Sequence, residues 1–238
     1  MDARSGGRTA WSSVAAPMRH MMRMGTEQIQ LPDNQYTIKY SGGVILMART
    51  FSFGGVTSGQ IFQLGYVVPD ADASMRFYAQ TLKVGPFTCS RGFKAPDGLY
   101  RGSTDMPELT IAHAYNGRLF VEFIQQHDDT PSVYTELIKK HGYGLHHFGL
   151  AIAPEEYDRT LDFYYGLGFE NVFTDTLPGG MRIRYIGPKG DNELEKLRNE
   201  TGVSYLECVE ILPGEEAMFT GMYEASLSWD GVTLLRSR

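Results

Sequence analysis

The sequence predicts an α+β fold in which two βαβββ repeats form one curved mixed sheet around a cleft. Two strand-like segments share the same order of polar, glycine and aliphatic residues, and two later ones each carry a glutamate at the same place. A helix-like segment follows each of these four strands. The repeat length is constant, because His147 follows Gln63 by 84 residues and Glu207 follows Glu122 by 85.

The composition limits the classes of protein that the chain can belong to. Its 238 residues carry a formal net charge of -6, without the basic patch that nucleic-acid binding needs. No apolar run approaches the roughly 18 residues of a membrane span. Cys89 and Cys208 form no CxxC motif, which argues against a disulfide framework or a cysteine metal site. We therefore expect a cytoplasmic protein with neither a nucleic-acid nor a membrane partner.

The beginning of the chain differs in composition from the repeats. Residues 1–24 contain several arginines and a single acidic residue, Asp2, a composition that can mark a targeting segment. Because no amphipathic period accompanies it and several methionines follow, we interpret 1–24 as a disordered or artefactual leader, with a targeting segment as the alternative. Residues 25–60 are rich in glycine, serine and threonine and predict an irregular N-terminal arm.

The first repeat is predicted to form a module over residues 61–142. Its opening strand, "FQLGYVVPD", ends at a proline turn and leads into a helix with a Phe-Tyr pair. Three further strands and a second helix follow, the helix having a Thr-Pro start and two lysines before a glycine. The predicted strands are 62–70, 85–93, 108–115 and the first part of the segment 119–137, and the helices are 71–82 and 130–142.

The second repeat is predicted to form a module over residues 143–230, followed by a tail at 231–238. Its opening strand, "HHFGLAIAP", matches that of the first repeat, and the next helix again carries an aromatic pair. Each module alone would leave an open sheet edge and an apolar face, and packing the two together buries both. The predicted strands are 146–154, 169–175, 180–187 and the first part of the segment 204–222, and the first helix is 155–169.

The adjacent histidines His146 and His147 stand at the start of an apolar strand. Neighbouring side chains of a strand point to opposite faces, so both cannot reach the same cleft as strand neighbours. His147 takes the place of Gln63 in the repeat alignment. We therefore expect His147 to face the cleft and His146 to pack outside it or at the start of the strand.

Two glutamates lie on apolar strand faces at equivalent places of the two repeats. Glu122 and Glu207 would each be costly there unless paired or bound to a cation. Together with Gln63 and His147 they form a candidate set of four metal ligands, one on each strand. Three oxygen donors and one imidazole suit a divalent ion such as Zn, Ni, Co, Mn or Mg. The alternatives are glutamates at an exposed strand edge, a core hydrogen bond from Gln63 and a structural role for His147.

These motifs resemble those of the vicinal oxygen chelate superfamily, also called the glyoxalase/bleomycin resistance/dioxygenase fold. The segment "QLGYVVPDADASMRFYAQTL" resembles its opening strand and helix, "VEFIQQ" its "ELIQP" strand, and "GLHHFGLAI" the "GIHHIAF" strand of methylmalonyl-CoA epimerases. The resemblance covers residues 61–229 and implies metal ligands at Gln63, Glu122, His147 and Glu207. This combination resembles glyoxalase I of the eukaryotic type, whereas epimerases usually have His first and Gln second, and extradiol dioxygenases have His first.

The resemblance implies a metal-dependent isomerase, epimerase or lyase that abstracts a proton next to a carbonyl through a metal-stabilised enolate. Glu207 is the expected base and Glu122 the second candidate. The implied partners are a small-molecule carbonyl or thioester substrate and a second copy of the chain in a homodimer. Two other functions stay open: a metal-free, resistance-type protein that binds a small molecule, and a non-haem iron oxygenase.

Two further residue pairs are candidates for substrate binding. His113 and Tyr115 share one face of a predicted strand, and Arg182 and Arg184 share one face of another. An arginine pair on a cleft strand could hold a carboxylate or a phosphate. The alternative is that the two arginines lie on a solvated face.

Overall fold

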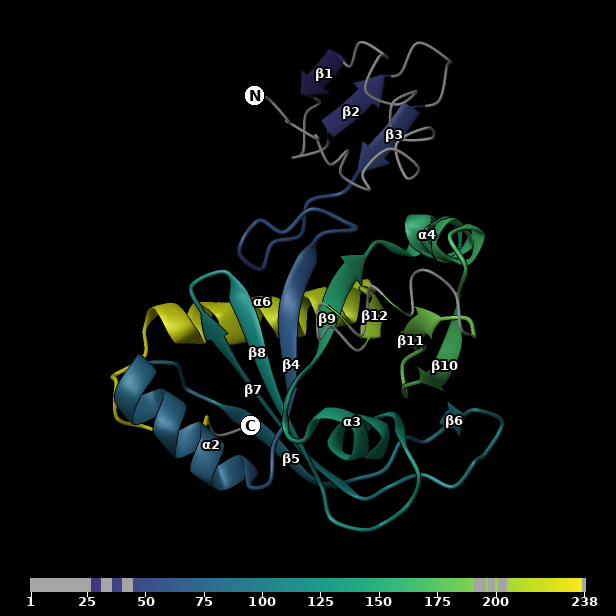
Figure 1. Ribbon diagram of the computed structural model, residues 1–238. Helices are drawn as coiled ribbons and strands as arrows, with labels where there is room; N and C mark the ends of the chain where they lie inside the picture. The colour runs from purple at the N-terminus through teal and green to yellow at the C-terminus, as the bar shows by residue number, and fades with distance from the viewer. Residues whose placement is uncertain are drawn as a thin grey trace, which may run out of the picture. The chain divides into compact units, whose positions relative to one another are not determined.

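Figure 1 shows the computed structural model of the chain, which describes residues 27–30, 36–39, 45–190, 196, 200 and 205–236. The leader predicted at 1–24 lies outside these residues. The chain divides into two units, residues 1–49 and residues 50–238. In the first unit, β1 (Glu27–Gln30), β2 (Tyr36–Lys39) and β3 (Ile45–Ala48) form an antiparallel sheet within the stretch predicted to be an irregular arm.

The second unit contains a nine-stranded mixed sheet in the order β5-β7-β8-β4-β9-β12-β11-β10-β6. Its two central strands, β4 and β9, pair antiparallel, and each pairs in parallel with the last long strand of its own repeat, β8 or β12. This arrangement confirms the predicted α+β class and the pairing of two repeats in one curled sheet. The strands are β4 (Ile61–Val67), β5 (Thr88–Phe93), β6 (Leu99–Tyr100), β7 (Leu109–Asn116), β8 (Leu119–Gln126), β9 (Gly144–Ile152), β10 (Phe169–Thr176), β11 (Arg182–Pro188) and β12 (Tyr205–Glu210).

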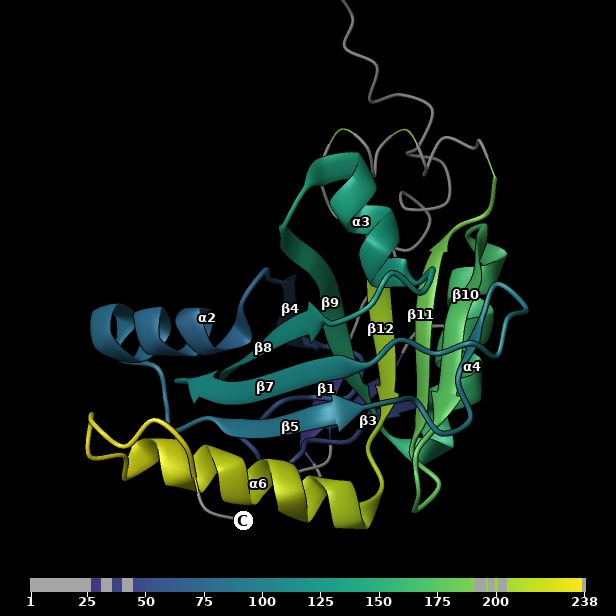
Figure 2. The same ribbon diagram turned by 90° about the horizontal axis from the view of Figure 1, so that it is seen from below.

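The helices of the second unit are α2 (Ala71–Phe77), which continues as the π-helical turn η1 (Tyr78–Leu82), α3 (Val133–His141), α4 (Pro154–Gly166) and α6 (Pro213–Leu227). In sequence, α2 and α4 follow the two central strands, and Figure 2 shows them at opposite ends of the sheet. The equivalent positions of α2 and α4 follow from the repeat. None of the helices in the described part of the chain is long and apolar enough to cross a bilayer.

The beginning of the second unit is part of the core rather than a loose connection. Phe51 and Phe53 are buried, and their rings stack with centroids 5.2 Å apart. Phe53 also contacts Phe62 of β4 and Phe219 of α6. Residues 50–60, which the sequence groups with the arm, therefore anchor the first central strand and α6 through aromatic packing.

The connection between β5 and β7 links the two ends of the sheet. It leaves β5 at one edge, and its short strand β6 pairs with β10 at the other edge, Tyr100 opposite Phe173. We call residues 94–108 the strap. The backbone N–H of Asp97 donates to Asp175 Oδ1 at 3.0 Å, and the backbone N–H of Arg101 donates to the Val172 carbonyl at 3.1 Å. A segment of the first repeat thus extends the sheet of the second.

Candidate metal centre

Side chains from the four central strands meet at one buried point. Gln63 on β4 places its Nε2 3.1 Å from Glu122 Oε2, 3.0 Å from Glu207 Oε2 and 2.9 Å from His147 Nε2. All four residues are buried, and His147 is fully inaccessible. The structure therefore brings together the four residues that the repeat and the resemblance indicate as ligands.

The spacing of these groups suits a divalent ion. Ligand atoms of Glu122, His147 and Glu207 all lie within 4.8 Å of one another. His147 Nε2 is 3.2 Å from Glu122 Oε2 and 3.3 Å from Glu207 Oε2. Metal–ligand bonds of about 2.1 Å at angles of about 90–110° place neighbouring ligand atoms about 3.0–3.4 Å apart. The two measured separations fall in that range, so a cation would fit with little movement of these side chains.

The amide of Gln63 can supply the fourth ligand atom. Its Nε2 points at two carboxylate oxygens and an imidazole nitrogen, which are all acceptors of a hydrogen bond when the histidine is neutral. A half-turn of the amide exchanges Nε2 with Oε1, and the orientation follows whichever hydrogen bonds are available. With a cation between the carboxylates, Oε1 is the atom that should face it.

The charges of the site are strongly coupled. Burial lowers the pKa of His147, but the carboxylates of Glu207 and Glu122 outweigh burial and raise it to about 9. Burial raises the pKa of Glu122, and the contacts with His113 and His147 then bring it below its usual range. Without a cation, the imidazolium of His147 therefore balances part of the negative charge, and a divalent ion has to displace that proton.

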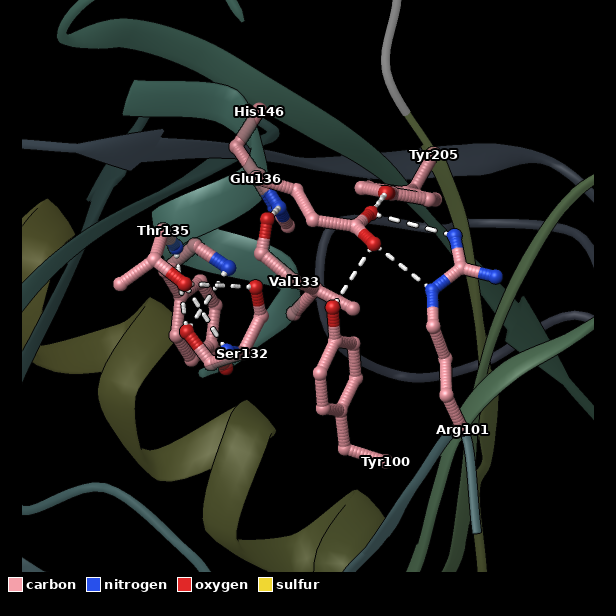
Figure 3. A network of polar contacts seen from close by, with 9 residues as sticks. Tyr100, Arg101, Ser132, Val133, Thr135, Glu136, His146 and Tyr205 are labelled. Carbon is pink, nitrogen blue, oxygen red and sulfur yellow. Dashed lines mark hydrogen bonds and ion pairs between the residues drawn. The ribbon is translucent and has the colours of Figure 1, made fainter. Parts of the chain in front are cut away.

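His146 stands at the start of β9 and is not among the described residues that line the cavity, as expected, but its side chain does not face away from that of His147, so simple strand alternation fails here. A β-bulge explains the difference: Gly65 pairs with His147 but Tyr66 pairs with Leu145, so His146 is the extra residue. Its Nδ1 lies 3.0 Å from Nδ1 of His147. Its Nε2 lies 3.2 Å from the Val133 carbonyl, a contact drawn in Figure 3.

This pair of contacts determines which nitrogen of His147 reaches the site. The Val133 carbonyl can only accept, so His146 Nε2 carries the proton and Nδ1 of a neutral His146 accepts. Burial lowers the pKa of His146 well below its usual value, with the charge on His147 as a further cause, so His146 is neutral. His147 then donates from Nδ1, which leaves its Nε2 directed at the carboxylates as a metal ligand should be.

A cavity of about 620 Å³ lies over the site. Gln63, Glu122 and Glu207 line it together with strap, α3 and α6 residues. Sequence reasoning missed the cavity residues Tyr134 and Tyr185, because no local pattern indicates that α3 and β11 approach the same space. One pattern could have indicated Tyr185: it follows Ile183 by two residues on a predicted strand, so the two side chains share one face of the sheet.

Of the two substrate contacts predicted on β7, His113 lies at the cavity and Tyr115 does not. His113 lines the cavity, its Nε2 is 2.8 Å from Glu122 Oε1, and its ring stacks on Phe120 with centroids 5.0 Å apart. Tyr115 shares the same strand face but is buried against Phe120 and Tyr223 of α6. The helix covers this end of the strand, so Tyr115 is a core residue and is not among the described residues that line the cavity.

The arginine pair lies away from the cavity. On β11, Ile183 and Tyr185 line the cavity, so the alternating residues Arg182 and Arg184 point to the other face. Arg182 Nε and Nη2 donate to the two oxygens of Glu210 at 2.8 Å each. Arg184 Nη1 donates to the backbone carbonyls of residues 175 and 183. Neither guanidinium is placed to hold a substrate in the cavity.

A second polar cluster holds the strap to α3 and β12, and the sequence did not indicate it. Glu136 Oε1 accepts from the Tyr100 hydroxyl and from Arg101 Nε, both at 2.7 Å, and Oε2 accepts from the Tyr205 hydroxyl (Figure 3). Arg101 takes a left-handed backbone conformation with φ of 46°. We call these four residues the Glu136 cluster. It joins three elements that are distant in sequence beside the cavity.

Fold and site together define a mixed sheet of two repeats with a buried carboxylate–imidazole cluster beside a cavity. The chain belongs to the Glyoxalase/Bleomycin resistance protein/Dioxygenase superfamily, whose family model matches residues 62–185. The match contains Gln63, Glu122 and His147, whereas Glu207 lies beyond it and is placed by the structure. It confirms the resemblance that the sequence motifs indicated.

Several solved structures are similar in fold at low sequence identity. Methylmalonyl-CoA epimerase from Mycobacterium tuberculosis aligns with a TM-score of 0.44 and 16% identity over 67% of this chain and 93% of that chain. Hypothetical protein BH1468 from Bacillus halodurans C-125 aligns with a TM-score of 0.43 and 17% identity over 64% of this chain and 94% of its own. A variant of Streptomyces coelicolor methylmalonyl-CoA epimerase in complex with 2-nitronate-propionyl-CoA aligns with a TM-score of 0.46 and 18% identity over 66% and 96% of the two chains. No curated protein sequence matches this chain.

Proposed function

We propose that this protein is a metal-dependent isomerase, epimerase or lyase that removes a proton next to a substrate carbonyl. The observation that carries the proposal is the convergence of Gln63, Glu122, His147 and Glu207 at metal-ligand spacing beside the cavity. These residues would hold one divalent ion, Zn, Ni, Co, Mn or Mg. When bound, the ion supplies a Lewis acid that stabilises negative charge developing on the substrate oxygen.

Glu207 is the better placed of the two carboxylates to act as the base. Both oxygens of Glu122 are engaged, Oε1 by His113 and Oε2 by Gln63. The contacts of Glu207 with described residues all use Oε2, and the residue lines the cavity. Glu207 can therefore take a proton from the substrate carbon through Oε1 and return it, a contribution of about 10²–10⁴-fold for a positioned base. Glu122 is the second candidate.

His113 is the remaining cavity residue that we propose to contact the substrate. Its stacking on Phe120 and its contact with Glu122 hold the imidazole in place on the cavity wall. From there it can hydrogen-bond a substrate oxygen while keeping Glu122 oriented. We do not propose Tyr115, Arg182 or Arg184 as substrate contacts. Tyr115 is packed in the core, and the two arginines lie on the other face of the sheet.

The test is the metal content of protein purified without chelator, measured by elemental mass spectrometry. We expect about one equivalent of a divalent ion in the wild type and its loss in Glu207→Gln. Glu210→Gln is the matched control, because Glu210 is a buried glutamate of the same strand that pairs with Arg182 on the other face. Wild-type protein that stays metal-free after incubation with these ions, with unchanged Tm, would overturn the proposal.

Two alternatives are tested by the same preparation. A metal-free binding protein is favoured by one observation: Nε2 of a protonated His147 lies 3.2 Å from Glu122 and 3.3 Å from Glu207 and can pair with both carboxylates without a cation. An iron oxygenase would need iron and consume oxygen, and the single imidazole of the set departs from the two-histidine, one-carboxylate pattern of such enzymes. The homodimer and the cytoplasmic location stay predictions, the first of which light scattering would check.

A further inference from the structure

We infer that the substrate of this site is an uncharged, largely apolar alicyclic or aromatic carbonyl compound rather than an anionic thioester. The inference rests on the proposed function and names its substrate class. It depends on three features of the cavity: the chemistry of its wall, the sign of its charges, and its enclosure by the strap, α3 and α6.

The wall of the cavity is predominantly apolar and contains many aromatic and methionine side chains. Among the described residues that line it, four are phenylalanines and four are methionines. Phe93 and Met106 come from the two ends of the strap region, Phe173 from β10, and Phe219 and Met222 from α6. Aromatic faces favour stacking with a planar or ring-shaped ligand, and methionines adapt their shape to irregular apolar groups. A polar acyl carrier would leave most of this surface without a partner.

Among the described lining residues, a single side chain other than an imidazole is basic, so the wall offers an anionic substrate little positive charge apart from the proposed metal. Apart from imidazoles, the charged side chains among the described lining residues are Glu122, Asp175, Glu207 and Arg236. Arg236 is exposed and donates from Nη1 to the Gly221 carbonyl at 2.6 Å. The phosphates of a coenzyme A thioester, or the carboxylates of a glutathione adduct, are normally met by arginine or lysine.

The arginine of the strap, Arg101, does not add a positive charge to the cavity wall. Arg101 is paired with Glu136 of α3, whose carboxylate it contacts at 2.7 Å and 3.3 Å. Asp175 Oδ1 is occupied by the backbone N–H groups of Asp97 and Thr176. The strap therefore lines one side of the cavity through Ala95, Tyr100, Met106 and Pro107, while Arg101 and Asp175 are engaged in contacts within the protein. Burying an apolar ligand there is favourable, because it removes apolar surface from water.

The size of the cavity fits such a ligand. A volume of about 620 Å³ falls within the roughly 300–1,000 Å³ of pockets that bury drug-sized molecules. One end of the ligand would meet the polar cluster of Gln63, Glu122 and Glu207, and the remainder would meet apolar wall. A single carbonyl oxygen on a ring system satisfies this asymmetry, because its other atoms need no hydrogen-bond partner.

The experiment compares two probes by isothermal titration calorimetry: 2-acetylnaphthalene as an uncharged aryl ketone, and acetyl-CoA as an anionic thioester. We expect the ketone to bind with a Kd at least tenfold below that of acetyl-CoA. Met106→Glu places a charge on the cavity wall and should weaken ketone binding at least tenfold, while Met106→Leu preserves it. Leu99→Glu is the matched control, since Leu99 belongs to the same strap but is exposed and not among the lining residues.

Metal content, measured on the same preparations, separates this inference from the proposed function. Tighter binding of acetyl-CoA, or ketone binding that Met106→Glu leaves unchanged at an unchanged Tm, would overturn the substrate class even if one equivalent of metal is present. Ketone binding by a protein that takes up no metal would support the apolar ligand class and contradict only the metal-dependent reaction. Equal binding of the ketone to wild type and Leu99→Glu supports the inference.

Discussion

The imidazole of His147 occupies the space that a side chain at Gly65 would need. A Cβ built on Gly65 would lie 1.8 Å from Cε1 of His147, and the register of β4 and β9 pairs these two residues directly. The same relationship holds with the two strands exchanged. A Cβ on Gly149 of β9 would lie 2.7 Å from Cβ of Gln63 on β4, which is the register partner of Gly149. Each repeat thus supplies one proposed ligand on its central strand and the glycine that makes room for the proposed ligand on the central strand of the other repeat.

Replacing Gly65 should therefore disable the site. We expect Gly65→Ala to displace the His147 ring and to abolish metal uptake, with a loss of stability of about 1–3 kcal/mol from overpacking. Elemental mass spectrometry and thermal unfolding measure the two effects. Gly166→Ala is the control, since a Cβ there meets nothing within 4 Å. Unchanged metal content in Gly65→Ala would show that His147 is not a ligand.

His146 should tune metal affinity without touching the metal. Its Nδ1 accepts from His147, and this contact directs Nε2 of His147 into the site. We expect His146→Phe to weaken metal binding about 10–100-fold, the usual effect of losing such an orienting partner. A chelator-competition titration measures it, with His141→Gln, an exposed histidine at the end of α3, as the control. Equal affinities in wild type and His146→Phe would contradict the orienting role.

Metal uptake should release a proton and strengthen with pH. The carboxylates raise the pKa of His147 to about 9 against the effect of burial, so the ion competes with a bound proton below that pH. Apparent affinity should rise by at most about tenfold per pH unit up to pH ~9, because a single proton is displaced. Calorimetry in buffers of different ionisation enthalpy counts the released proton, and a count near zero at pH 7 would contradict the prediction.

The same raised pKa predicts how the metal-free protein responds to pH. A folded-state pKa of about 9 for His147, against about 6.5 in the unfolded chain, stabilises the fold fully below about pH 6.5. This contribution is lost as pH rises through about 9. Thermal unfolding of metal-free wild type and of His147→Gln should therefore converge at high pH, and parallel curves would rule this linkage out.

The Glu136 cluster should hold the strap in place. Glu136→Gln removes the charge that pairs with Arg101 and accepts from Tyr100 and Tyr205. We expect a loss of about 1–3 kcal/mol, typical of hydrogen bonds to a charged group, and faster amide hydrogen exchange in residues 94–108. Glu155→Gln, an exposed acid on α4, is the control. Unchanged exchange in the strap would show that other contacts close it.

Much of the site could be predicted because its information is local. Strand alternation places Gln63, Glu122, His147 and Glu207 on one face each, and the repeat indicates that these faces are equivalent. The same alternation failed at His146, where a β-bulge adds a residue that no local pattern announces. It also grouped Arg182 with Arg184 correctly on one face without revealing that this face is turned away from the cavity.

The sequence by itself determined the repeat, the two equivalent central strands and the four polar side chains that they carry, because these depend on spacing within short segments. Only the tertiary structure decided how the strap joins the two ends of the sheet, how Glu136 connects it to α3 and β12, and that the cavity wall is apolar with many aromatic and methionine side chains. Those features join residues such as Tyr100, Glu136 and Tyr205 that are far apart in the chain. Their proximity follows from how the curled sheet brings its edges together, which no segment encodes alone.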